Sequence, residues 1–323
     1  MTTLPAAQPS ARHTRILGLG HYQPAQVVTN QDLIDRGVDT DDEWIRSRVG
    51  IAERRYAAPD ETVVDLAEQA GSKALANAGV ATDDVDLVIA ATCTMPSPVP
   101  ACAPQLAARL GIQAPGAFDV NSGCAGFAYA LNSASAAVIA GQAKTVLVVA
   151  AERFSGWLDF TDRSTCIILG DGAGAAVVGG ATEPGIGPVV WGSDGDLSEK
   201  VVINPSTGFF EQDGQAVYRW ATTRMVPIAL EACARAGVDP SELAAFVPHQ
   251  ANLRIIEMIA KKLGVPSDRV ARDIVESGNT SAATIPLALS KMVARGDIPS
   301  GAPVLILGFG SGLAFAGQVV LAP

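Results

Sequence analysis

The chain of 323 residues is 48% hydrophobic and 17% charged, a balance that suits a globular protein with a large core and excludes a disordered chain. Its net charge of −10 argues against nonspecific binding to nucleic acid. No apolar run reaches membrane-spanning length, and the polar first residues lack the apolar centre of a signal peptide. We therefore expect a cytoplasmic protein without nucleic-acid or membrane partners, in which residues 1–13 form a disordered leader.

Short apolar runs alternate with helix-like segments along the chain. The runs are nearly continuous, as in strands buried on both faces, and predict strands at 15–20, 87–91, 117–121, 145–150, 173–178, 244–248 and 304–308. The segments between them predict helices at 63–78, 105–110, 125–140, 217–236, 255–263 and 283–294. This alternation is typical of an α/β fold with a mostly parallel sheet.

The chain also repeats itself once. Four segments resemble four later ones in the same order: 77–92 and 235–250, 109–112 and 262–265, 122–126 and 277–281, 144–152 and 302–310. Two copies indicate a duplicated fold rather than a solenoid, with halves at 14–183 and 184–323. Because equivalent loops of two pseudo-twofold-related halves meet at their shared face, we expect Cys124, Asn279 and His249 to converge.

The five cysteines argue against disulfides, because their number is odd and their spacing is irregular, and no CxxC pair suggests a zinc site. We expect neither disulfides nor a bound metal. Free cysteines usually pack as small buried apolar residues, the role that we assign to Cys93, Cys102, Cys166 and Cys233.

Cys124 differs from these four by its position in NSGCAGFAYAL (121–131), where a predicted helix begins. A thiol at a helix N-terminus is stabilised as a thiolate by the helix dipole and by free backbone N–H groups. The small neighbours Gly123, Ala125 and Gly126 would let a substrate carbonyl come close. From this segment alone, packing residue and nucleophile both remain open.

His249 and Asn279 also allow two interpretations each. His249, in VPHQANLRI, is either a core residue or a catalytic group, and it ends a predicted buried strand, where catalytic groups concentrate. Asn279, in ESGNTSAATIPLAL, suits a helix cap, while its side-chain amide can also donate to a substrate carbonyl. Both roles can hold for different atoms of the amide.

Two glycine-rich segments need separate interpretations. GDGAGAAVVGG (170–180) lacks the GxGxxG spacing of a phosphate loop and is followed by a strand, which favours close backbone packing or a hairpin. GFGSGLAFAG (308–317) follows a predicted strand and can present a free backbone N–H to a substrate.

Together these motifs resemble those of β-ketoacyl-acyl-carrier-protein synthase III, the condensing enzyme that starts type II fatty-acid synthesis. TDDEWIRSRVGIAERR, CAGFAYAL, TDRST, GDGAGAAV, VPHQANLRI and GNTSAA match in order, and the last two together are highly specific. The resemblance runs from Arg15 to the C-terminus. It implies an α/β thiolase-like fold, in which two pseudo-twofold-related halves form a layered αβαβα core, in agreement with the repeat.

The resemblance further implies the residues of the site. The catalytic residues would be Cys124, His249 and Asn279, and the backbone N–H groups of Cys124 and Ser311 would hold the oxyanion. The implied coenzyme A contacts are Trp44 and Arg163, flanking the adenine, with Arg48, Gln215 and Asn252. The implied docking patch for the acidic acyl carrier protein is Arg254, Lys261 and Lys262, which would otherwise be interpreted as a solvated helix face.

Four features depart from well-known members of the family. Asn121-Ser122-Gly123 precedes the cysteine where many members have small apolar residues, and Ser311 stands where many have glycine. Segment 198–213 is short where the substrate channel is usually bordered. Val99 aligns with an often bulky aromatic residue that reaches the acyl pocket of the partner subunit in a homodimer. The smaller side chain predicts a roomier pocket that tolerates branched or medium-length primers.

The implied reaction is a decarboxylating Claisen condensation of an acyl-CoA primer with malonyl-acyl-carrier-protein, giving 3-oxoacyl-acyl-carrier-protein and initiating fatty-acid biosynthesis. Coenzyme A thioester is then a substrate, and no cofactor is expected. A polyketide-priming relative or an acyltransferase that does not decarboxylate would keep the same three residues. A Cys-His-Asn hydrolase uses the same residue types, but its Asn orients its His. A degradative thiolase would need a second cysteine as a base in segment 308–317, and this segment contains no cysteine.

Overall fold

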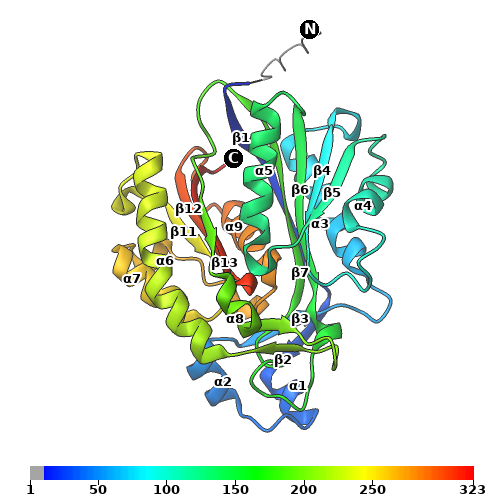
Figure 1. Ribbon diagram of the computed structural model, residues 1–323, viewed down its shortest axis with the longest axis vertical. Coiled ribbons are helices and arrows are strands. Elements are labelled where there is room, and N and C mark those ends of the chain that lie inside the picture. The colour runs from blue at the N-terminus through cyan, green and yellow to red at the C-terminus, as the bar shows by residue number, and fades with distance from the viewer. Residues whose placement is uncertain (1–10) are drawn as a thin grey trace.

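The computed structural model describes residues 11–323 (Figure 1). Its first strand, β1, begins at His13, so the last residue of the predicted leader belongs to a strand. Leader residues 1–10 lie outside the described residues. None of the helices in the described part of the chain is long and apolar enough to pass through a bilayer.

The first of two large sheets has five strands in the order β1-β7-β6-β4-β5. Their bounds are His13–Tyr22 (β1), Asp171–Ala181 (β7), Thr145–Arg153 (β6), Leu87–Ala91 (β4) and Gly116–Val120 (β5). Helices α3 (Val63–Ala78) and α4 (Cys102–Leu110) cover its outer face (Figure 1), where their buried aliphatic side chains pack against the strands. The predicted strands and helices of this half are confirmed, with their ends shifted by a few residues.

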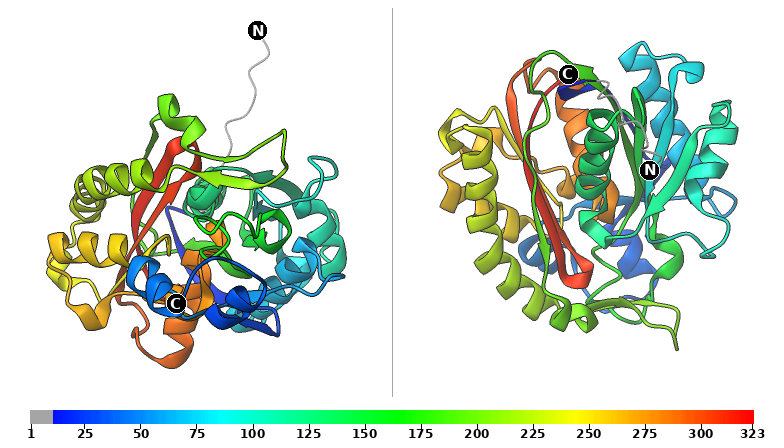
Figure 2. Two further views of the ribbon diagram at one scale, coloured as in Figure 1. Left: turned by 90° about the horizontal axis from the view of Figure 1, so that it is seen from below. Right: turned by 45° about the horizontal axis from the view of Figure 1, so that its top comes forward.

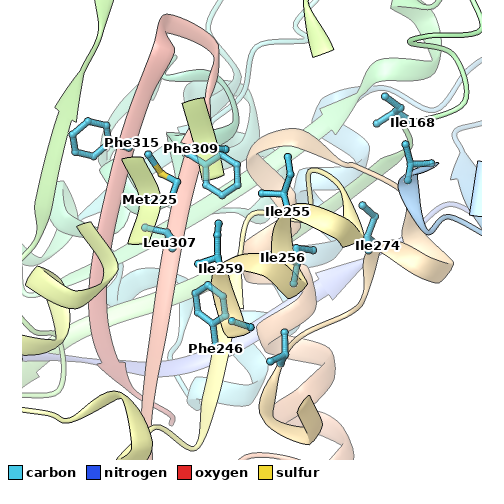
Figure 3. Close-up of a cluster of buried hydrophobic side chains, with 14 of the residues drawn as sticks. Ile168, Met225, Phe246, Ile255, Ile256, Ile259, Ile274, Leu307, Phe309 and Phe315 are labelled. Carbon is cyan, nitrogen blue, oxygen red and sulfur yellow. The ribbon is translucent and has the colours of Figure 1, made fainter. Parts of the chain in front are cut away.

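The second sheet has four strands in the order β11-β12-β13-β8. Their bounds are Ala245–Pro248 (β11), Pro303–Gly310 (β12), Ala314–Leu321 (β13) and Val190–Ser193 (β8). Helices α6 (Gly214–Ala236) and α7 (Leu253–Leu263) cover its outer face. Figure 3 shows part of this buried cluster, in which Ile255 and Ile259 of α7 lie near Phe246 and Leu307 of the sheet.

Two helices, α5 (Gly126–Ile139) and α9 (Thr284–Arg295), lie between the sheets and contact both of them. The layers therefore follow one another as helices, sheet, helices, sheet, helices (Figure 2). Most residues of α9 and α5 are buried because both sheets cover them, which explains why these two segments are apolar on nearly every side.

The two halves share one order of elements. The first runs β1-α3-β4-α4-β5-α5-β6-β7, and the second runs β8-α6-β11-α7-α9-β12-β13. Where a second copy of β5 would lie, Val270 forms a single parallel bridge with Phe246 of β11. The duplicated, layered fold is thus confirmed, while the division between residues 183 and 184 stays a prediction.

The direction of the strands differs from the sequence prediction of a mostly parallel sheet. β4 runs parallel to β5 and β6, and β11 runs parallel to β12. β7 is antiparallel to both β1 and β6, and β13 is antiparallel to both β12 and β8. Both sheets are therefore mixed. A strand covered by helices on both faces is continuously apolar in either direction, so the apolar runs could not reveal it.

The glycine-rich segment 170–180 forms most of strand β7. A Cβ atom on Gly174 would lie 2.5 Å from the backbone nitrogen of Leu287, in the central helix α9. Glycine therefore lets helix backbone lie directly on strand backbone. The predicted close backbone packing is confirmed.

Shorter elements complete the fold, and α1, α2, β2 and β3 lie together at the lower end of the molecule in Figure 1. The helices are α1 (Asn30–Asp35), α2 (Asp42–Val49) and α8 (Ile274–Ser277). Two small antiparallel sheets pair β2 (Gln26–Thr29) with β3 (Glu53–Tyr56), and β9 (Val201–Ile203) with β10 (Phe210–Gln212).

Candidate active site

One cavity of about 590 Å³ is lined by residues of both halves. Cys124, His249 and Asn279 all line it, although they are far apart in the sequence. The convergence that the repeat predicted is therefore present. Among residues 11–323, no group of three or more His, Cys, Asp or Glu side chains could hold a metal ion.

Cys124 lies in a short 3₁₀ turn, Gly123–Ala125, immediately before the buried helix α5. Gly123 has a φ of +48°, and a Cβ atom there would lie 2.7 Å from Cβ of Ser311. A Cβ atom on Gly310 would lie 2.9 Å from the Cys124 sulfur. The two glycines let the chain of the second half approach the thiol closely. The absence of a side chain at Gly123 leaves room for the side chain of Ser311.

Burial dominates the acidity of this thiol. Burial raises the pKa of Cys124 to about 11, although the Ser281 hydroxyl and the backbone N–H groups of Ser311 and Cys124 lower the pKa by hydrogen-bonding to the sulfur. The predicted N–H donors are present, but their effect is outweighed. With its pKa raised in this way, the resting group at neutral pH is a thiol.

His249 follows strand β11 and is 2% exposed. Its ring meets Phe309 edge-on, with ring centroids 5.3 Å apart. Burial lowers the pKa of His249 to about 3, so the imidazole is neutral at physiological pH. A neutral imidazole can donate one hydrogen bond to a developing oxyanion, but it adds no positive charge to the cavity.

The Thr284 hydroxyl contacts Nδ1 of His249 and is compatible with either tautomer of the ring. The hydroxyl oxygen lies 2.8 Å from His249 Nδ1 and 2.9 Å from the carbonyl oxygen of Ser281. The hydroxyl has one proton. When it donates to Nδ1, Nε2 carries the imidazole proton and can donate. When it donates to the Ser281 carbonyl, Nδ1 donates to the hydroxyl and Nε2 is an acceptor.

Asn279 is fixed in orientation by its own turn. Its Oδ1 accepts a hydrogen bond of 2.8 Å from the backbone N–H of Ser281, two residues further on. The N-cap of the following turn is Thr280, so Asn279 is not the helix cap that its sequence suited. Its backbone bonds to Ile168 and Gly170. These bonds leave the NH₂ group of the amide as the donor that faces a molecule in the cavity.

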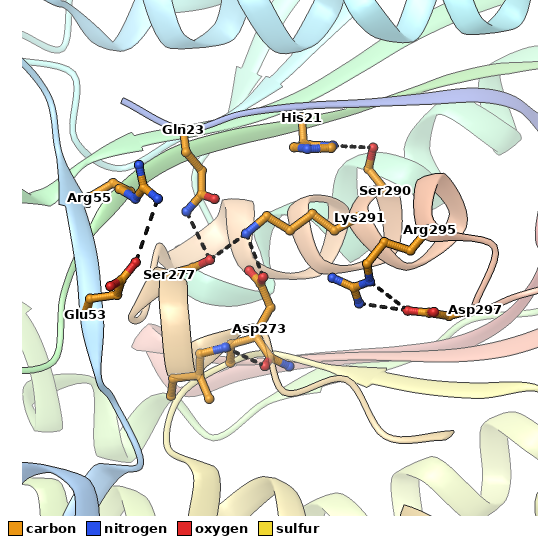
Figure 4. A network of polar contacts seen from close by, with 12 residues as sticks. His21, Gln23, Glu53, Arg55, Asp273, Ser277, Ser290, Lys291, Arg295 and Asp297 are labelled. Carbon is orange, nitrogen blue, oxygen red and sulfur yellow. Dashed lines mark hydrogen bonds and ion pairs between the residues drawn. The ribbon is translucent and has the colours of Figure 1, made fainter. Parts of the chain in front are cut away.

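A polar network anchors the segment just before Asn279 (Figure 4). Lys291 of α9 bonds to Asp273 at 2.8 Å and to the Ser277 hydroxyl at 2.9 Å, and Gln23 donates to the same hydroxyl at 3.0 Å. The Lys291–Asp273 pair is largely buried, so removing one partner would leave an uncompensated charge. These contacts therefore fix the position of the segment that leads into the turn of Asn279.

Polar and aromatic residues expected to contact coenzyme A surround the same cavity. Its lining includes Trp44, Arg48, Gln215 and Asn252. Arg163 does not line it, but its guanidinium lies over the Trp44 ring at 5.1 Å from the centroid. The two side chains are thus in contact, and a ring can enter between them only if one of them moves.

The expected docking residues lie on helix α7, at and beyond the rim. Arg254 lines the cavity and lies over the Tyr218 ring, 5.6 Å from its centroid. Lys261 and Lys262 are exposed in the last turn of α7, and Lys262 donates to the carbonyl oxygen of Thr222 at 3.2 Å. The structure brings Arg254, but not the two lysines, to the cavity.

Of the departing features, segment 198–213 contributes to the cavity lining and Val99 does not. Val201, Phe210 and Gln212 of the short β9–β10 sheet, within segment 198–213, line the cavity. Val99 does not line it and is 77% exposed. A place for Val99 in the acyl pocket therefore requires a second copy of the chain.

Sequence reasoning missed three residues near Cys124. Ser281 stands in the quoted GNTSAA, but no role was assigned to it. Cys93, assigned to packing, donates to the buried carboxylate of Glu152 at 3.3 Å and lies 3.7 Å from the Ser281 hydroxyl. The available signal was the charge itself, because Glu152 directly follows the apolar run 146–151 in strand β6.

Comparisons with known proteins agree with this geometry. Two family models match, "3-Oxoacyl-[acyl-carrier-protein (ACP)] synthase III" over residues 118–195 and its C-terminal counterpart over residues 233–321. A curated relative from Streptomyces coelicolor, "Beta-ketoacyl-[acyl-carrier-protein] synthase III 4", is 56% identical, covering 96% of this chain and 99% of the relative. The chain belongs to the β-ketoacyl-acyl-carrier-protein synthase III family.

Solved structures of this family superpose on the whole chain. The priming β-ketosynthase of the R1128 polyketide pathway has a TM-score of 0.94 at 43% identity, covering 100% of this chain and 98% of its own. The synthase III of Aquifex aeolicus has a TM-score of 0.92 at 38% identity, covering 95% and 99%. The fold is therefore thiolase-like, and the protein is a condensing enzyme of the acyltransferase type.

Proposed function

We propose that this chain condenses an acyl group from acyl-CoA with malonyl-acyl-carrier-protein, releases CO₂ and yields 3-oxoacyl-acyl-carrier-protein. The observation that carries the proposal is the meeting of Cys124, His249 and Asn279 in one cavity. A nucleophile and two neutral donors are what such a reaction requires.

In the first half-reaction, Cys124 attacks the acyl-CoA thioester and CoA leaves as its thiol. The backbone N–H groups of Cys124 and Ser311, which already point at the sulfur, hold the tetrahedral oxyanion. Trp44, Arg48, Arg163, Gln215 and Asn252 bind the CoA portion of the substrate. This step transfers the acyl group from the CoA sulfur to the Cys124 sulfur, and the transfer requires no metal or resident cofactor.

In the second half-reaction, malonyl-acyl-carrier-protein enters the same cavity. His249, as the neutral Nε2–H tautomer, and the Asn279 NH₂ group donate to the thioester oxygen, which stabilises the enolate left by CO₂. The carbanion attacks acyl-Cys124 and releases the cysteine. The acidic carrier protein binds to the exposed cations of helix α7, which are Arg254, Lys261 and Lys262.

We further propose a homodimer formed through strand β5. β5 is an edge strand of the first sheet, and its Phe118 is 44% exposed. An open edge with an exposed aromatic residue favours pairing with another chain. A second copy there would bring Val99 towards the neighbouring acyl pocket.

Fatty-acid synthesis and polyketide priming would use the same chemistry and differ in the primer and in the pathway. The similarity to a priming ketosynthase makes polyketide priming the alternative function. A Cys-His-Asn hydrolase is disfavoured by one observation. Asn279 Oδ1 bonds to the Ser281 N–H and His249 Nδ1 lies against Thr284, so the Asn does not orient the His.

Mass spectrometry of products tests the proposal directly. The enzyme is incubated with acyl-CoA, with and without malonyl-acyl-carrier-protein. We expect acyl-Cys124 alone in the first case and a 3-oxoacyl carrier protein in the second. Free acid as the main product would indicate a hydrolase and would refute the proposal.

The primer is tested with a panel of acyl-CoAs. Since Val99 is smaller than an aromatic residue, we expect isobutyryl-CoA and hexanoyl-CoA to acylate Cys124 at least as efficiently as acetyl-CoA does. Val99→Phe should shift the preference towards acetyl-CoA. A clear preference of the natural chain for acetyl-CoA would contradict the assigned pocket.

A further inference from the structure

Arg54, in strand β3, is the largest of the completely buried side chains among residues 11–323. The ion pairs in this part of the chain do not include one to Arg54. Burial lowers its pKa, but a guanidinium stays protonated at neutral pH. A buried charge without a counter-ion costs stability, so the groups that this guanidinium holds are of interest.

The guanidinium donates to three neutral oxygen atoms. Its Nη2 donates to the Ile167 carbonyl at 2.6 Å. Its Nη1 donates to Asn30 Oδ1 at 2.8 Å and to the Val28 carbonyl at 3.3 Å. The Nε of Arg54 has no hydrogen-bond partner among the described residues. The planar fork of the arginine therefore connects the start of the chain to residue 167, which lies 113 positions further on.

The segment that begins at Ile167 also holds Asn279. The N–H of Asn279 donates to the Ile168 carbonyl at 2.9 Å, and the N–H of Gly170 donates to the Asn279 carbonyl at 3.0 Å. Leu169 and Asn279 form an isolated parallel bridge. Arg54 and Asn279 therefore bind to neighbouring residues of one short segment.

The stem of Arg54 packs on both sides of this bridge. A Cβ atom on Gly278 would lie 3.0 Å from the Cβ atom of Arg54, and one on Gly170 would lie 3.1 Å from it. Gly278 directly precedes Asn279 and has a φ of +66°. Because both positions are glycine, the arginine stem lies directly on their backbone. Arg54 thus supports Asn279 through its stem and also through the bond to Ile167.

We propose that Arg54 is a positioning residue for Asn279 in the decarboxylation step. The Asn279 NH₂ group must lie at a fixed place relative to the thioester oxygen, and a misplacement of about 1 Å can cost ~10²-fold in rate. Cys124 lies on another turn, which none of these bonds reaches. Arg54 therefore supports the donor and leaves the nucleophile unaffected. The role of Asn279 in this inference rests on the proposed function.

Two substitutions of Arg54 test the proposal. Lysine keeps the charge but has one nitrogen in place of the fork, and methionine keeps only the stem. We expect CO₂ release from malonyl-acyl-carrier-protein to fall ~10-fold in Arg54→Lys and ~10²-fold in Arg54→Met. The values of kcat and kcat/KM should fall alike, because the weakened contact is made in the transition state. Acylation of Cys124, read by mass spectrometry, should change far less.

Asn30→Ala is a milder variant that leaves Arg54 in place. It removes one acceptor that orients the guanidinium and keeps the bond to Ile167. We expect a loss of decarboxylation in the same direction as in Arg54→Lys but smaller. This variant tests the proposal even if the substitutions of Arg54 prevent folding, and unchanged decarboxylation would contradict it.

A double-variant cycle shows whether Arg54 acts through the amide. If it does, Arg54→Lys should cost no further decarboxylation in a chain that already carries Asn279→Ala, since residues that act as a unit are not additive. Losses that multiply would mean that Arg54 acts elsewhere, and they would overturn the proposal.

Hydrogen exchange tests the placement without any substrate. In Arg54→Lys we expect the amides of Gly170 and Asn279 to exchange at least about fivefold faster, because the bridge between their segments loses support. Peptides that cover residues 122–126, with Cys124, should keep their rates. Unchanged exchange at Gly170 and Asn279 would overturn the proposal.

Arg55→Lys is the matched control. Arg55 is the next residue of the same strand, its side chain is partly exposed, and it pairs with Glu53 at 3.7 Å (Figure 4). We expect no change in either half-reaction or in hydrogen exchange at Asn279.

Thr14→Val is the control for a loss of stability alone. It removes a buried bond of 2.6 Å to Ser135, and neither residue lines the cavity. If Arg54 is only structural, acylation and decarboxylation fall together in its variants, as they would in a destabilised control. Absence of CO₂ release from the natural chain would instead refute the proposed function, while the exchange comparison would still decide whether Arg54 positions Asn279.

Discussion

The turn that carries Cys124 and the turn that carries Asn279 occupy equivalent places in the two halves. Each precedes a buried central helix, and each reactive residue follows a glycine with positive φ, +48° at Gly123 and +66° at Gly278. A glycine with positive φ therefore precedes the reactive residue in both halves, although Cys124 lies within the 3₁₀ turn before its helix and Asn279 lies ahead of the corresponding turn.

The two turns differ in what their side chains do. Cys124 is surrounded by N–H groups and by the Ser281 hydroxyl, which suits a sulfur that must lose a proton. Asn279 has its oxygen occupied by Ser281, which suits an amide that must donate. Under the proposed function, one duplicated scaffold thus provides a nucleophile from one copy and a neutral donor from the other.

The largest effect should come from removing the nucleophile. Cys124→Ala should lower self-acylation and condensation by roughly 10⁴-fold or more, because nothing else in the cavity can form the thioester. Decarboxylation of malonyl-acyl-carrier-protein should continue, since the donors of the other half remain. Acyl transfer is read by mass spectrometry and decarboxylation by CO₂ release. Undiminished condensation would refute the role of Cys124.

The reverse separation is expected for the second half. Asn279→Ala or His249→Ala should lower decarboxylation by ~10²–10³, the usual loss for one oxyanion donor. Acylation of Cys124 should change much less. The two half-reactions are measured separately in each variant. An equal loss in both would mean that the two turns do not divide the chemistry.

The fit between the turn of Cys124 and the last glycine-rich segment predicts an effect on stability. Gly123→Ala should destabilise the fold by about 1–3 kcal/mol through its positive φ, with a further loss from the contact with Ser311. Ser311→Gly in the same chain should recover the second part. Denaturant unfolding of the single and double variants measures the coupling.

Gly79→Ala is the control for the backbone part alone. Gly79 has a φ of +64°, and a Cβ atom there would have no neighbour within 4 Å. If Gly123→Ala costs no more than this control, and Ser311→Gly brings no recovery, then the two positions are independent.

The smallest effect concerns Thr284, which lies behind the imidazole. Thr284→Val keeps the shape of the side chain but removes the hydroxyl that can donate to His249 Nδ1. Losing one such bond costs about 1 kcal/mol, so we expect a roughly fivefold slower decarboxylation with acylation nearly unchanged. Thr284→Ser should restore the rate. Full activity of the valine variant would show that the tautomer is fixed elsewhere.

Sequence patterns predicted the five strands of the first sheet and the helices of the layers, because burial between layers imposes long apolar segments. In the second sheet they predicted β11 and β12 but missed β8 and β13. They did not reveal strand direction, since a doubly covered strand is apolar whether it runs parallel or antiparallel. The order of strands β7, β6 and β4 came only from the pairing of segments distant in the chain.

The repeat and the motifs by themselves determined that the fold is duplicated, and they predicted which half supplies the proposed nucleophile and which supplies the proposed donors. Only the tertiary structure decided the chemistry of the resting site. Burial makes Cys124 a thiol and His249 neutral, and it places Glu152 and Ser281 beside the sulfur. Acidity depends on solvent, dipoles and partners brought together by folding, and none of these is written in the local sequence.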